Sequence, residues 1–224
     1  MRILAIETAT AEGSVALLEG DRVLRQVVAS VPQRHLEWLA PAIDQALQAV
    51  GWRPAEVQAV AVSRGPGTFT GVRIGVATAA AWARATGIPL VAVSTLETLA
   101  AGVEEGGLIC PVLDARRGEV VGALFEGDGA LRRVTEDFVV PVEALLAELP
   151  KDRSVVLAGD ALARYGEVLR AHPQVRLARA DRWVPRAATT GRLALTRLLR
   201  GEHDDPYRVV PTYARPAPVA VSRA

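Results

Sequence analysis

A glycine-rich loop is the part of this sequence whose residue types could most directly do chemistry. The segment from Ser63 to Gly75, SRGPGTFTGVRIG, lies between a short apolar run and a helical pattern. Such a loop can bind phosphate, because free backbone N–H groups and the positive end of the helix dipole face the anion. The Walker form of this loop ends in Gly-Lys followed by Ser or Thr, whereas Val72 and Arg73 follow Gly71 here. The spacing therefore does not favour a nucleotide loop of that type.

The helix after this loop carries a stripe of very small side chains. Gly71, Gly75 and Ala79 recur every four residues, so they share one face and let another backbone approach closely. Each interior glycine costs a helix about 1 kcal/mol relative to alanine, and tight packing is the expected compensation. The residues leave two partners open for this face: a sheet and helix of the same chain, or the helices of another subunit.

Two acidic residues occupy equivalent places in a duplicated sequence. At an offset of 107 residues, Ile6-Glu7 aligns with Leu113-Asp114, and ALLEGD at 16–21 aligns with ALFEGD at 123–128. Each copy has the pattern of three strands joined by tight turns, and its first strand ends in the carboxylate. We therefore expect Glu7 and Asp114 at matching positions of two related lobes.

The elements that follow the three strands have the same order in both copies. Hydrophobic periodicity and capping signals predict helices at 36–50, 72–84, 141–149, 160–171 and 189–199, and a further helix that begins at the capping box Ser94-Thr95-Leu96-Glu97. They predict strands at 57–62, 90–93 and 154–157. This pattern predicts an α/β fold with a duplicated βββαβα arrangement. The predicted lobes are 1–106 and 107–224, and the second includes a Pro-rich tail from 206.

Composition narrows the class of protein. The chain has 224 residues, a formal charge of +1 and 50% hydrophobic residues, which is typical of an aliphatic α/β protein and not of a strongly basic nucleic-acid-binding chain. Cys110 is the only cysteine, so an internal disulfide is excluded and a reducing cytoplasm is expected. No apolar run is long enough to span a bilayer, and no signal peptide precedes the first strand, so we expect no membrane partner.

The histidines do not have metal-site spacing. A helical His-x-x-x-His site needs two imidazoles on one face, whereas His35, His172 and His203 are far apart in the sequence. We therefore expect no metal site and no metal-dependent catalysis.

The duplicated arrangement resembles the ribonuclease H-like superfold of actin, Hsp70 and the sugar kinases. In that superfold the two first-strand carboxylates usually face a nucleotide and its metal across the cleft between the lobes. Within it, the sequence resembles the TsaB (YeaZ) family from end to end. The segments that carry this resemblance are 3–10 (ILAIETAT), 63–75, 94–96 (STL), 114–120 (DARRGEV) and 211–215 (PTYAR), of which SRGPGTFTG is the most specific.

The resemblance implies a role in making threonylcarbamoyladenosine, the modified adenosine beside the anticodon in tRNAs that read ANN codons. It implies a non-catalytic subunit that binds the catalytic TsaD subunit, with a TsaE ATPase in the larger complex and tRNA contacted indirectly. It also implies a homodimer in isolation. The family's interface is formed by the first long helix and the helix after the glycine-rich loop. Carried onto this sequence, it comprises His35, Leu36, Leu39, Pro66, Gly67, Phe69, Thr70, Gly71, Ile74, Gly75, Thr78, Ala79 and Trp82.

Nucleotide-binding residues are present only in degraded form. The vestigial contacts that the superfold implies are Glu7, Thr8, Thr10, Asp114 and Gly159, and the bulky Arg116 and Arg117 stand in the second loop where active relatives have a glycine-rich turn. We expect no cofactor bound tightly by this chain alone, and ATP with magnesium only in the complex. Two rival functions are an ATP-dependent small-molecule kinase of the same superfold and a peptidase.

Overall fold

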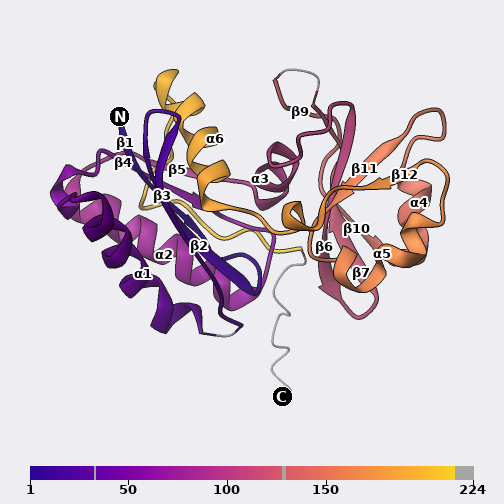
Figure 1. Cartoon of the computed structure of the whole chain (residues 1–224), viewed down its shortest axis with the longest axis horizontal. Helices are drawn as coiled ribbons and strands as arrows, with labels where there is room; N and C mark the ends of the chain where they lie inside the picture. The colour runs from indigo at the N-terminus through magenta and orange to yellow at the C-terminus, as the bar shows by residue number, and fades with distance from the viewer. Residues whose placement is uncertain (33, 128–129, 215–224) are drawn as a thin grey trace, which may run out of the picture.

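The computed structural model describes residues 1–32, 34–127 and 130–214, which form two α/β lobes side by side (Figure 1). The first sheet has the order β3-β2-β1-β4-β5. On one side of β1, the strands β2 and β3 pair antiparallel. On the other side, β4 and β5 run parallel to β1. The strands are β1 (Arg2–Glu7), β2 (Glu12–Glu19), β3 (Arg22–Ser30), β4 (Ala59–Ser63) and β5 (Leu90–Val93).

The second sheet repeats this topology, with the order β10-β7-β6-β11-β12. Ile6 pairs with Val15 in the first lobe and Leu113 pairs with Val121 in the second, so the duplicated first strands are hairpin partners of the next strand in both lobes. A small pair of strands, β8 and β9, is added beside β6. The strands are β6 (Leu108–Arg116), β7 (Glu119–Gly122), β8 (Phe125–Glu126), β9 (Arg132–Arg133), β10 (Phe138–Pro141), β11 (Val155–Ala158) and β12 (Val175–Leu177). The predicted duplicated fold is thus confirmed.

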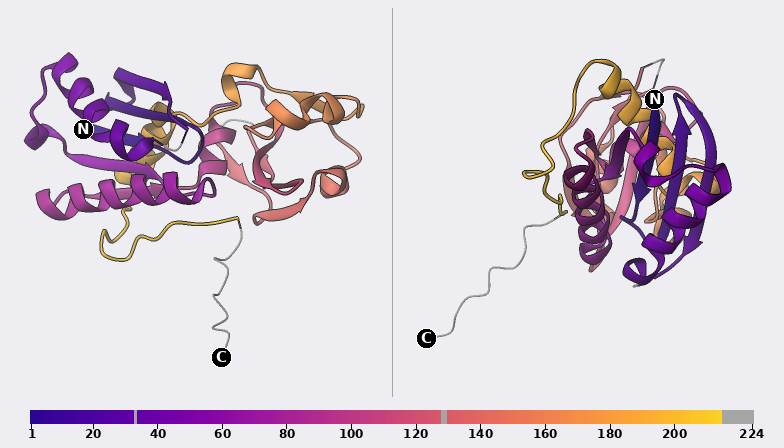
Figure 2. Two further views of the ribbon diagram at one scale, coloured as in Figure 1. Left: turned by 90° about the horizontal axis from the view of Figure 1, so that it is seen from below. Right: turned by 90° about the vertical axis from the view of Figure 1, so that its left-hand side faces the viewer.

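Helices cover both faces of the first sheet. The two long helices α1 (His35–Val50) and α2 (Phe69–Thr86) lie on one face, and α6 (Ala187–Leu199) lies on the other (Figures 1 and 2). Both long helices end at a glycine in the left-handed region, Gly51 and Gly87, where a side chain would be strained. The shorter helices are α3 (Thr95–Ala101), α4 (Leu145–Glu148) and α5 (Leu162–Arg170), with single turns at Pro54–Glu56, Val142–Ala144 and Ala180–Arg182.

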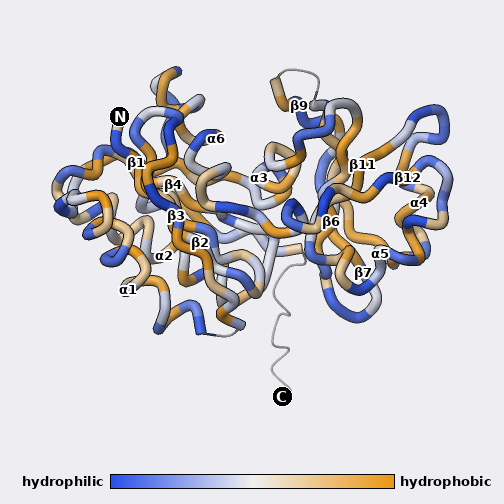
Figure 3. The backbone as a smooth tube through the Cα atoms, viewed as in Figure 1, coloured by the Kyte–Doolittle hydropathy of each residue, from blue (hydrophilic) through white to orange (hydrophobic). Residues whose placement is uncertain are grey.

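Successive residues of the central strand of the first lobe face opposite cores. Leu4 and Ile6 belong to the core beneath α1 and α2, while Ile3 and Ala5 face α6. The face toward α6 is rich in alanine, and Gly191 of α6 leaves no room for a Cβ beside Leu18 and Ala5. A strand buried on both faces reads as a continuous apolar run, as β1 does, and Figure 3 shows such runs inside both lobes.

The lobes exchange their last helices. The helix α6, from the second half of the sequence, packs on β1, β2, β4 and β5 of the first lobe. The helix α3, from the first half, packs on β6, where Leu96 and Leu99 join the core around Phe125. The predicted lobes 1–106 and 107–224 follow the duplication in the sequence, whereas in the packing α6 lies with the first lobe and α3 lies with the second. The tail beyond Ala214 lies outside the described residues.

The structure departs from the predicted elements in several places. The predicted helix at 141–149 is a single turn at Val142–Ala144 followed by the short helix α4 (Leu145–Glu148). The short strand β12 was missed, because three residues give too little alternation to recognise. Ser94 precedes α3 in an extended conformation, but within the described structure its side chain makes no capping bond, and its Oγ accepts from Arg133 at 3.4 Å. Among the described residues, no helix combines the length and the apolar character needed to cross a membrane.

Candidate functional site

The small-residue face of α2 is buried against the chain's own first sheet. A Cβ atom at Gly75 would lie less than 3.0 Å from Oγ1 of Thr8, and one at Gly71 would collide with the backbone oxygen of the same threonine. The Thr8 hydroxyl donates to the Gly71 carbonyl oxygen at 2.8 Å. The alternative of an intramolecular partner, which the sequence left open, is therefore the one that the structure contains.

This packing buries part of the predicted interface within the chain, and the interface itself stays a prediction. Six of its members are buried in the core of the first lobe or in the loop in front of α2: His35, Leu39, Pro66, Gly71, Gly75 and Ala79. Its remaining members are exposed or half-buried: Leu36, Gly67, Phe69, Thr70, Ile74, Thr78 and Trp82. Leu36 and Phe69 are large apolar side chains that are 75% and 48% exposed.

A second stripe of small residues forms the outer face of α2. Ala77, Ala81 and Ala85 also recur every four residues, and all three are exposed. Sequence reasoning missed them because two small-residue stripes share this helix, and only the glycine stripe was interpreted. The outer face of α2, defined here as Thr70, Ala77, Ala81 and Ala85 with the half-buried Ile74 and Trp82, is thus the part of the helix that another chain can contact.

The glycine-rich loop is held by contacts within the chain. The N–H of Thr68 donates to the Ala9 oxygen at 2.7 Å, and the Gly65 oxygen accepts from the N–H of Thr95 at 2.9 Å. Gly65 has a φ of 103°, and a side chain there would collide with the backbone of Thr212. The loop therefore fixes the start of α2 against its neighbours.

Glu7 does not face the space between the lobes. Its side chain is fully buried, and its carboxylate accepts hydrogen bonds from the Ser63 hydroxyl and from the N–H of Ala9, the latter at 2.8 Å. The hydroxyls of Thr98 and Thr190 lie 3.5 and 3.3 Å from that of Ser63. Burial raises the pKa of Glu7 to about 7, and the hydrogen bonds from Ser63 and the backbone oppose this shift. This carboxylate is a structural group inside the first lobe.

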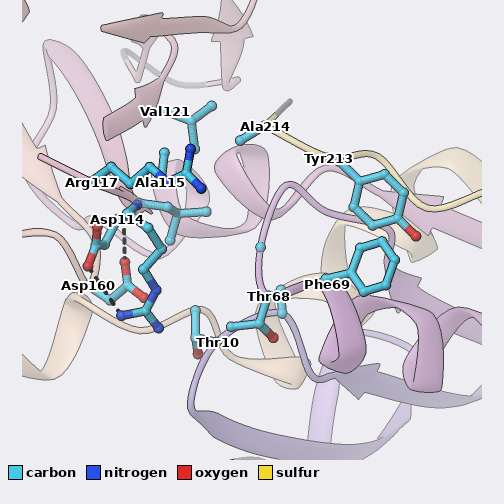
Figure 4. Close-up of a pocket in the computed structure, with 14 residues that line it drawn as sticks. Thr10, Thr68, Phe69, Asp114, Ala115, Arg117, Val121, Asp160, Tyr213 and Ala214 are labelled. Atoms are coloured by element: carbon cyan, nitrogen blue, oxygen red, sulfur yellow. Dashed lines mark hydrogen bonds and ion pairs between the residues drawn. The ribbon is translucent and has the colours of Figure 1, made fainter. Parts of the chain in front are cut away.

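A cavity of about 510 Å³ lies between the lobes (Figure 4). Among the predicted nucleotide contacts, Thr10 and Asp114 line it, whereas Glu7 and Thr8 are buried in the first lobe. Gly159 packs on the backbone of Val112, where a side chain would collide. The residues that line the cavity are Ala9, Thr10, Gly67, Thr68, Phe69, Leu113, Asp114, Ala115, Arg116, Arg117, Val121, Asp160, Tyr213 and Ala214.

One wall of this interlobe cavity carries four charged residues. Asp160 accepts the backbone N–H of Asp114 at 3.0 Å, and Asp114 accepts the N–H of Arg116 at 2.8 Å and lies 3.6 Å from its guanidinium. Burial raises the pKa of Asp160, and its hydrogen bond from Asp114 opposes the shift. The sequence analysis did not predict Asp160 as a residue of this site. A usable signal was its place shortly after β11, the strand that pairs with β6 and so ends near Asp114.

Both arginines of this wall have left-handed backbone. The φ angles of Arg116 and Arg117 are 68° and 56°, and Gly118 follows at 83°. Left-handed conformation costs a residue with a side chain about 1–2 kcal/mol, so two consecutive arginines are an unusual choice at this turn.

The opposite wall carries Phe69 and Tyr213, which form a clasp with the neighbouring Arg73. The Arg73 guanidinium lies 3.7 Å from the Phe69 ring centroid, and its Nε donates to the Tyr213 hydroxyl at 2.6 Å. The two rings are 5.1 Å apart. The clasp fastens the C-terminal strap, residues 203–214, along α2 (Figure 2).

The histidines remain apart in the fold. His35 is buried at the start of α1, and burial lowers its pKa, while a hydrogen bond with the backbone of Thr10 opposes the shift. His172 follows α5 and its Nδ1 accepts from Gln174 at 3.4 Å, whereas His203 begins the strap. Within the ranges that the structure describes, no cluster of three or more His, Cys, Asp or Glu side chains has metal-site geometry.

Comparison with known proteins identifies the family. Residues 23–179 match the family described as TsaD, tRNA N6-adenosine threonylcarbamoyltransferase. The tRNA threonylcarbamoyladenosine biosynthesis protein TsaB of Bacillus subtilis (strain 168) is 40% identical over 162 residues, which cover 71% of each chain. The chain belongs to the TsaB family. The resemblance carried by the SRGPGTFTG segment is thus confirmed, and so is the family's connection with tRNA threonylcarbamoyladenosine biosynthesis.

Solved structures extend this TsaB-family match to the whole fold. YeaZ from Pseudomonas aeruginosa superposes with a TM-score of 0.82 and 31% identity, covering 95% of this chain and 99% of that one. The activator of the 2-hydroxyisocaproyl-CoA dehydratase from Clostridium difficile superposes with a TM-score of 0.53 at 11% identity, covering 90% and 97%. This second likeness concerns the fold alone, which is that of the actin-like ATPases.

Proposed function

We propose that this chain is a non-catalytic subunit that binds and supports a TsaD-like transferase during threonylcarbamoylation of the adenosine beside the anticodon in tRNAs reading ANN codons. The observation that carries the proposal is the position of Glu7. A superfold member that uses a metal nucleotide needs its first-strand carboxylate in the cleft, whereas Ser63 and Ala9 hold this one inside the first lobe. In this proposal, the chain binds the TsaD-like subunit, and the TsaD-like subunit catalyses the transfer.

The charged groups of the interlobe cavity support the same conclusion. Asp114, the second carboxylate that would hold a metal, is engaged with the backbone and guanidinium of Arg116. A cation placed beside Asp114 would meet the positive charge of that arginine. The arrangement therefore opposes the metal-nucleotide chemistry of a kinase of this superfold.

The outer face of α2 fits the docking role. Its alanines allow the axis of another helix to approach closely, and Leu36 of α1 and Phe69 at the start of α2 are further exposed apolar side chains. In the proposed assembly this face contacts the TsaD-like subunit. A TsaE-like ATPase joins the larger complex, tRNA is contacted through the complex, and the assembly works in the cytoplasm, where tRNA is modified. Without the partner, the same face pairs two copies of this chain.

Reconstitution with purified components tests the role. A TsaD-like subunit, threonylcarbamoyl adenylate and tRNA are combined with wild-type chain, with Glu7→Gln, or without the chain. We expect product only when the chain is present, and equal rates for wild type and Glu7→Gln once both are shown to be folded. Product formed by the chain without the TsaD-like subunit would contradict the proposal. So would a Glu7→Gln variant that binds the partner normally and yields no product.

A further inference from the structure

The strap, residues 203–214, is fastened to the first lobe at both ends. At its start, the N–H of Asp204 donates to the Leu90 oxygen at 2.7 Å. At its end, the N–H of Thr212 donates to the Arg64 oxygen at 2.6 Å. The strap is therefore a fixed part of the fold that runs beside α2, as Figure 2 shows.

A hollow of about 540 Å³ lies between the strap and α2. Its apolar lining, here called the strap groove, consists of Val76, Ala77, Ala80, Val209, Val210 and Pro211. Two arginines of α2 also line the hollow, and both guanidinium groups are engaged with the strap. Arg84 donates to the Pro206 oxygen at 2.9 and 2.6 Å, and Arg73 donates to the Tyr213 hydroxyl at 2.6 Å. Because these charges are engaged, the groove is suited to an apolar side chain.

The strap presents large apolar side chains to the outside beside this groove. Val209 is half-buried and packs against the core of the first lobe, whereas the next residue, Val210, is 64% exposed. Tyr207, earlier in the strap, is 74% exposed. Exposed apolar side chains that gather around a groove mark an interaction surface.

The strap groove is continuous with the outer face of α2, because Ala77 belongs to both. Small residues let the axis of a second helix approach to about 8–10 Å. A helix with its side chains is about 10–12 Å across, so a helix on the alanines of α2 also extends over the groove beside Ala77. A large apolar side chain on that edge of the helix then meets Val210, as in other helix-in-groove contacts.

We propose that the strap groove is part of the surface on which a TsaD-like subunit docks, and that it receives a large apolar side chain from a helix laid on α2. This inference rests on the proposed function and adds the strap to its docking surface. A TsaD-like subunit has helices of the required kind, since residues 23–179 of this chain, which contain α1 and α2, match the TsaD family.

Isothermal titration against a purified TsaD-like subunit tests the groove. Val210→Glu places a charge at the exposed edge of the groove and should weaken binding by about 10-fold or more. Val168→Glu, at an exposed position of α5, is the matched control and should bind as wild type. Exchange of the Thr212 amide hydrogen at the wild-type rate in Val210→Glu shows that the strap is still in place.

Ala81→Arg, on the outer face of α2 but outside the groove, separates this inference from the proposed function. Weaker binding of Ala81→Arg together with wild-type affinity of Val210→Glu would overturn the role of the groove and leave the docking of α2 intact. Wild-type affinity of both variants would overturn both.

Photocross-linking gives a second measurement that does not depend on affinity. Cys110 is the only cysteine and is fully buried, so Val210→Cys can be labelled at a single site with a benzophenone maleimide. We expect a covalent product with the TsaD-like subunit, which mass spectrometry maps to the apolar face of one of its helices. A yield no higher than from Val168→Cys, or a product only between two copies of this chain, would overturn the proposal.

Discussion

Gly75 of α2 lies directly on Thr8 at the end of β1, with no room for a Cβ atom between the helix and the threonine hydroxyl. The same hydroxyl donates to the carbonyl oxygen of Gly71 one turn earlier in the helix. The glycine stripe of α2 is therefore a packing surface of the first lobe. It brings the helix close to the sheet, and the opposite face of the helix is left for a partner.

The first prediction concerns Gly75→Leu. The new side chain must displace Thr8 and the neighbouring Val62 and Ile6, so we expect the free energy of unfolding to fall by about 1–3 kcal/mol, as for other overpacked cores. Urea denaturation measures it. The control is Ala77→Leu on the exposed face of the same helix, which should change stability by less than about 0.5 kcal/mol. Equal effects of the two substitutions would show that the glycine face is not a tight contact.

The second prediction concerns Glu7 and pH. Its pKa in the folded protein is about 7, above the ordinary value of 4.5, because burial disfavours the charged form. The folded state therefore keeps a proton that the unfolded state releases between these values, and stability is lost as pH rises from about 4.5 to about 7. A shift of this size corresponds to roughly 3 kcal/mol at most.

Glu7→Gln removes this titration and serves as the test. The variant should lose less stability than wild type between pH 5 and pH 8 in urea denaturation, because a neutral amide replaces the carboxyl. Parallel stability profiles for the two proteins over this range would contradict the buried, proton-retaining carboxyl described above.

The third prediction concerns the clasp at the end of the strap. Tyr213→Phe removes the hydrogen bond from Arg73, and Tyr213→Ala also removes the ring contact with Phe69. The Thr212 amide donates to the Arg64 oxygen at 2.6 Å, so its hydrogen exchange reports on the strap. We expect the exchange rate to rise by about 5-fold from wild type to Tyr213→Phe, and by about 5-fold again to Tyr213→Ala. The control is Tyr207→Ala, which lies earlier in the strap and stacks on Arg84. It should leave the exchange rate of the Thr212 amide unchanged. Identical exchange at Thr212 in all variants would show that the clasp does not hold the strap.

Much of the fold could be predicted from the sequence because local pattern and tertiary packing agree. The strand at 90–93 coincides with β5, and the apolar spacing from Leu36 to Val50 marks α1 to within one residue. The 107-residue repeat predicts that the two sheets share a topology. The exchange of α3 and α6 between lobes could not be predicted, because a helix's periodicity shows that it has a buried face but not which sheet covers it.

The site was less accessible to sequence reasoning. The Gly71, Gly75 and Ala79 stripe was recognised, yet its partner was misassigned, since a bare helical face suits a strand of the same chain as well as a foreign helix. The role of Glu7 depends on Ser63, which lies 56 residues away and meets it only through the pairing of β1 and β4. The left-handed arginines were visible as residues, but their backbone conformation was not.

The most direct test of the account is the affinity of this chain for a TsaD-like subunit, measured by isothermal titration for wild type and Ala81→Arg. Ala81 lies on the outer face of α2, so a bulky charge there should weaken binding by about 30-fold or more without loss of folding. The matched control Ala163→Arg lies at an exposed position of α5 and should bind as wild type. Wild-type affinity in Ala81→Arg would contradict the claim that the chain docks through this face.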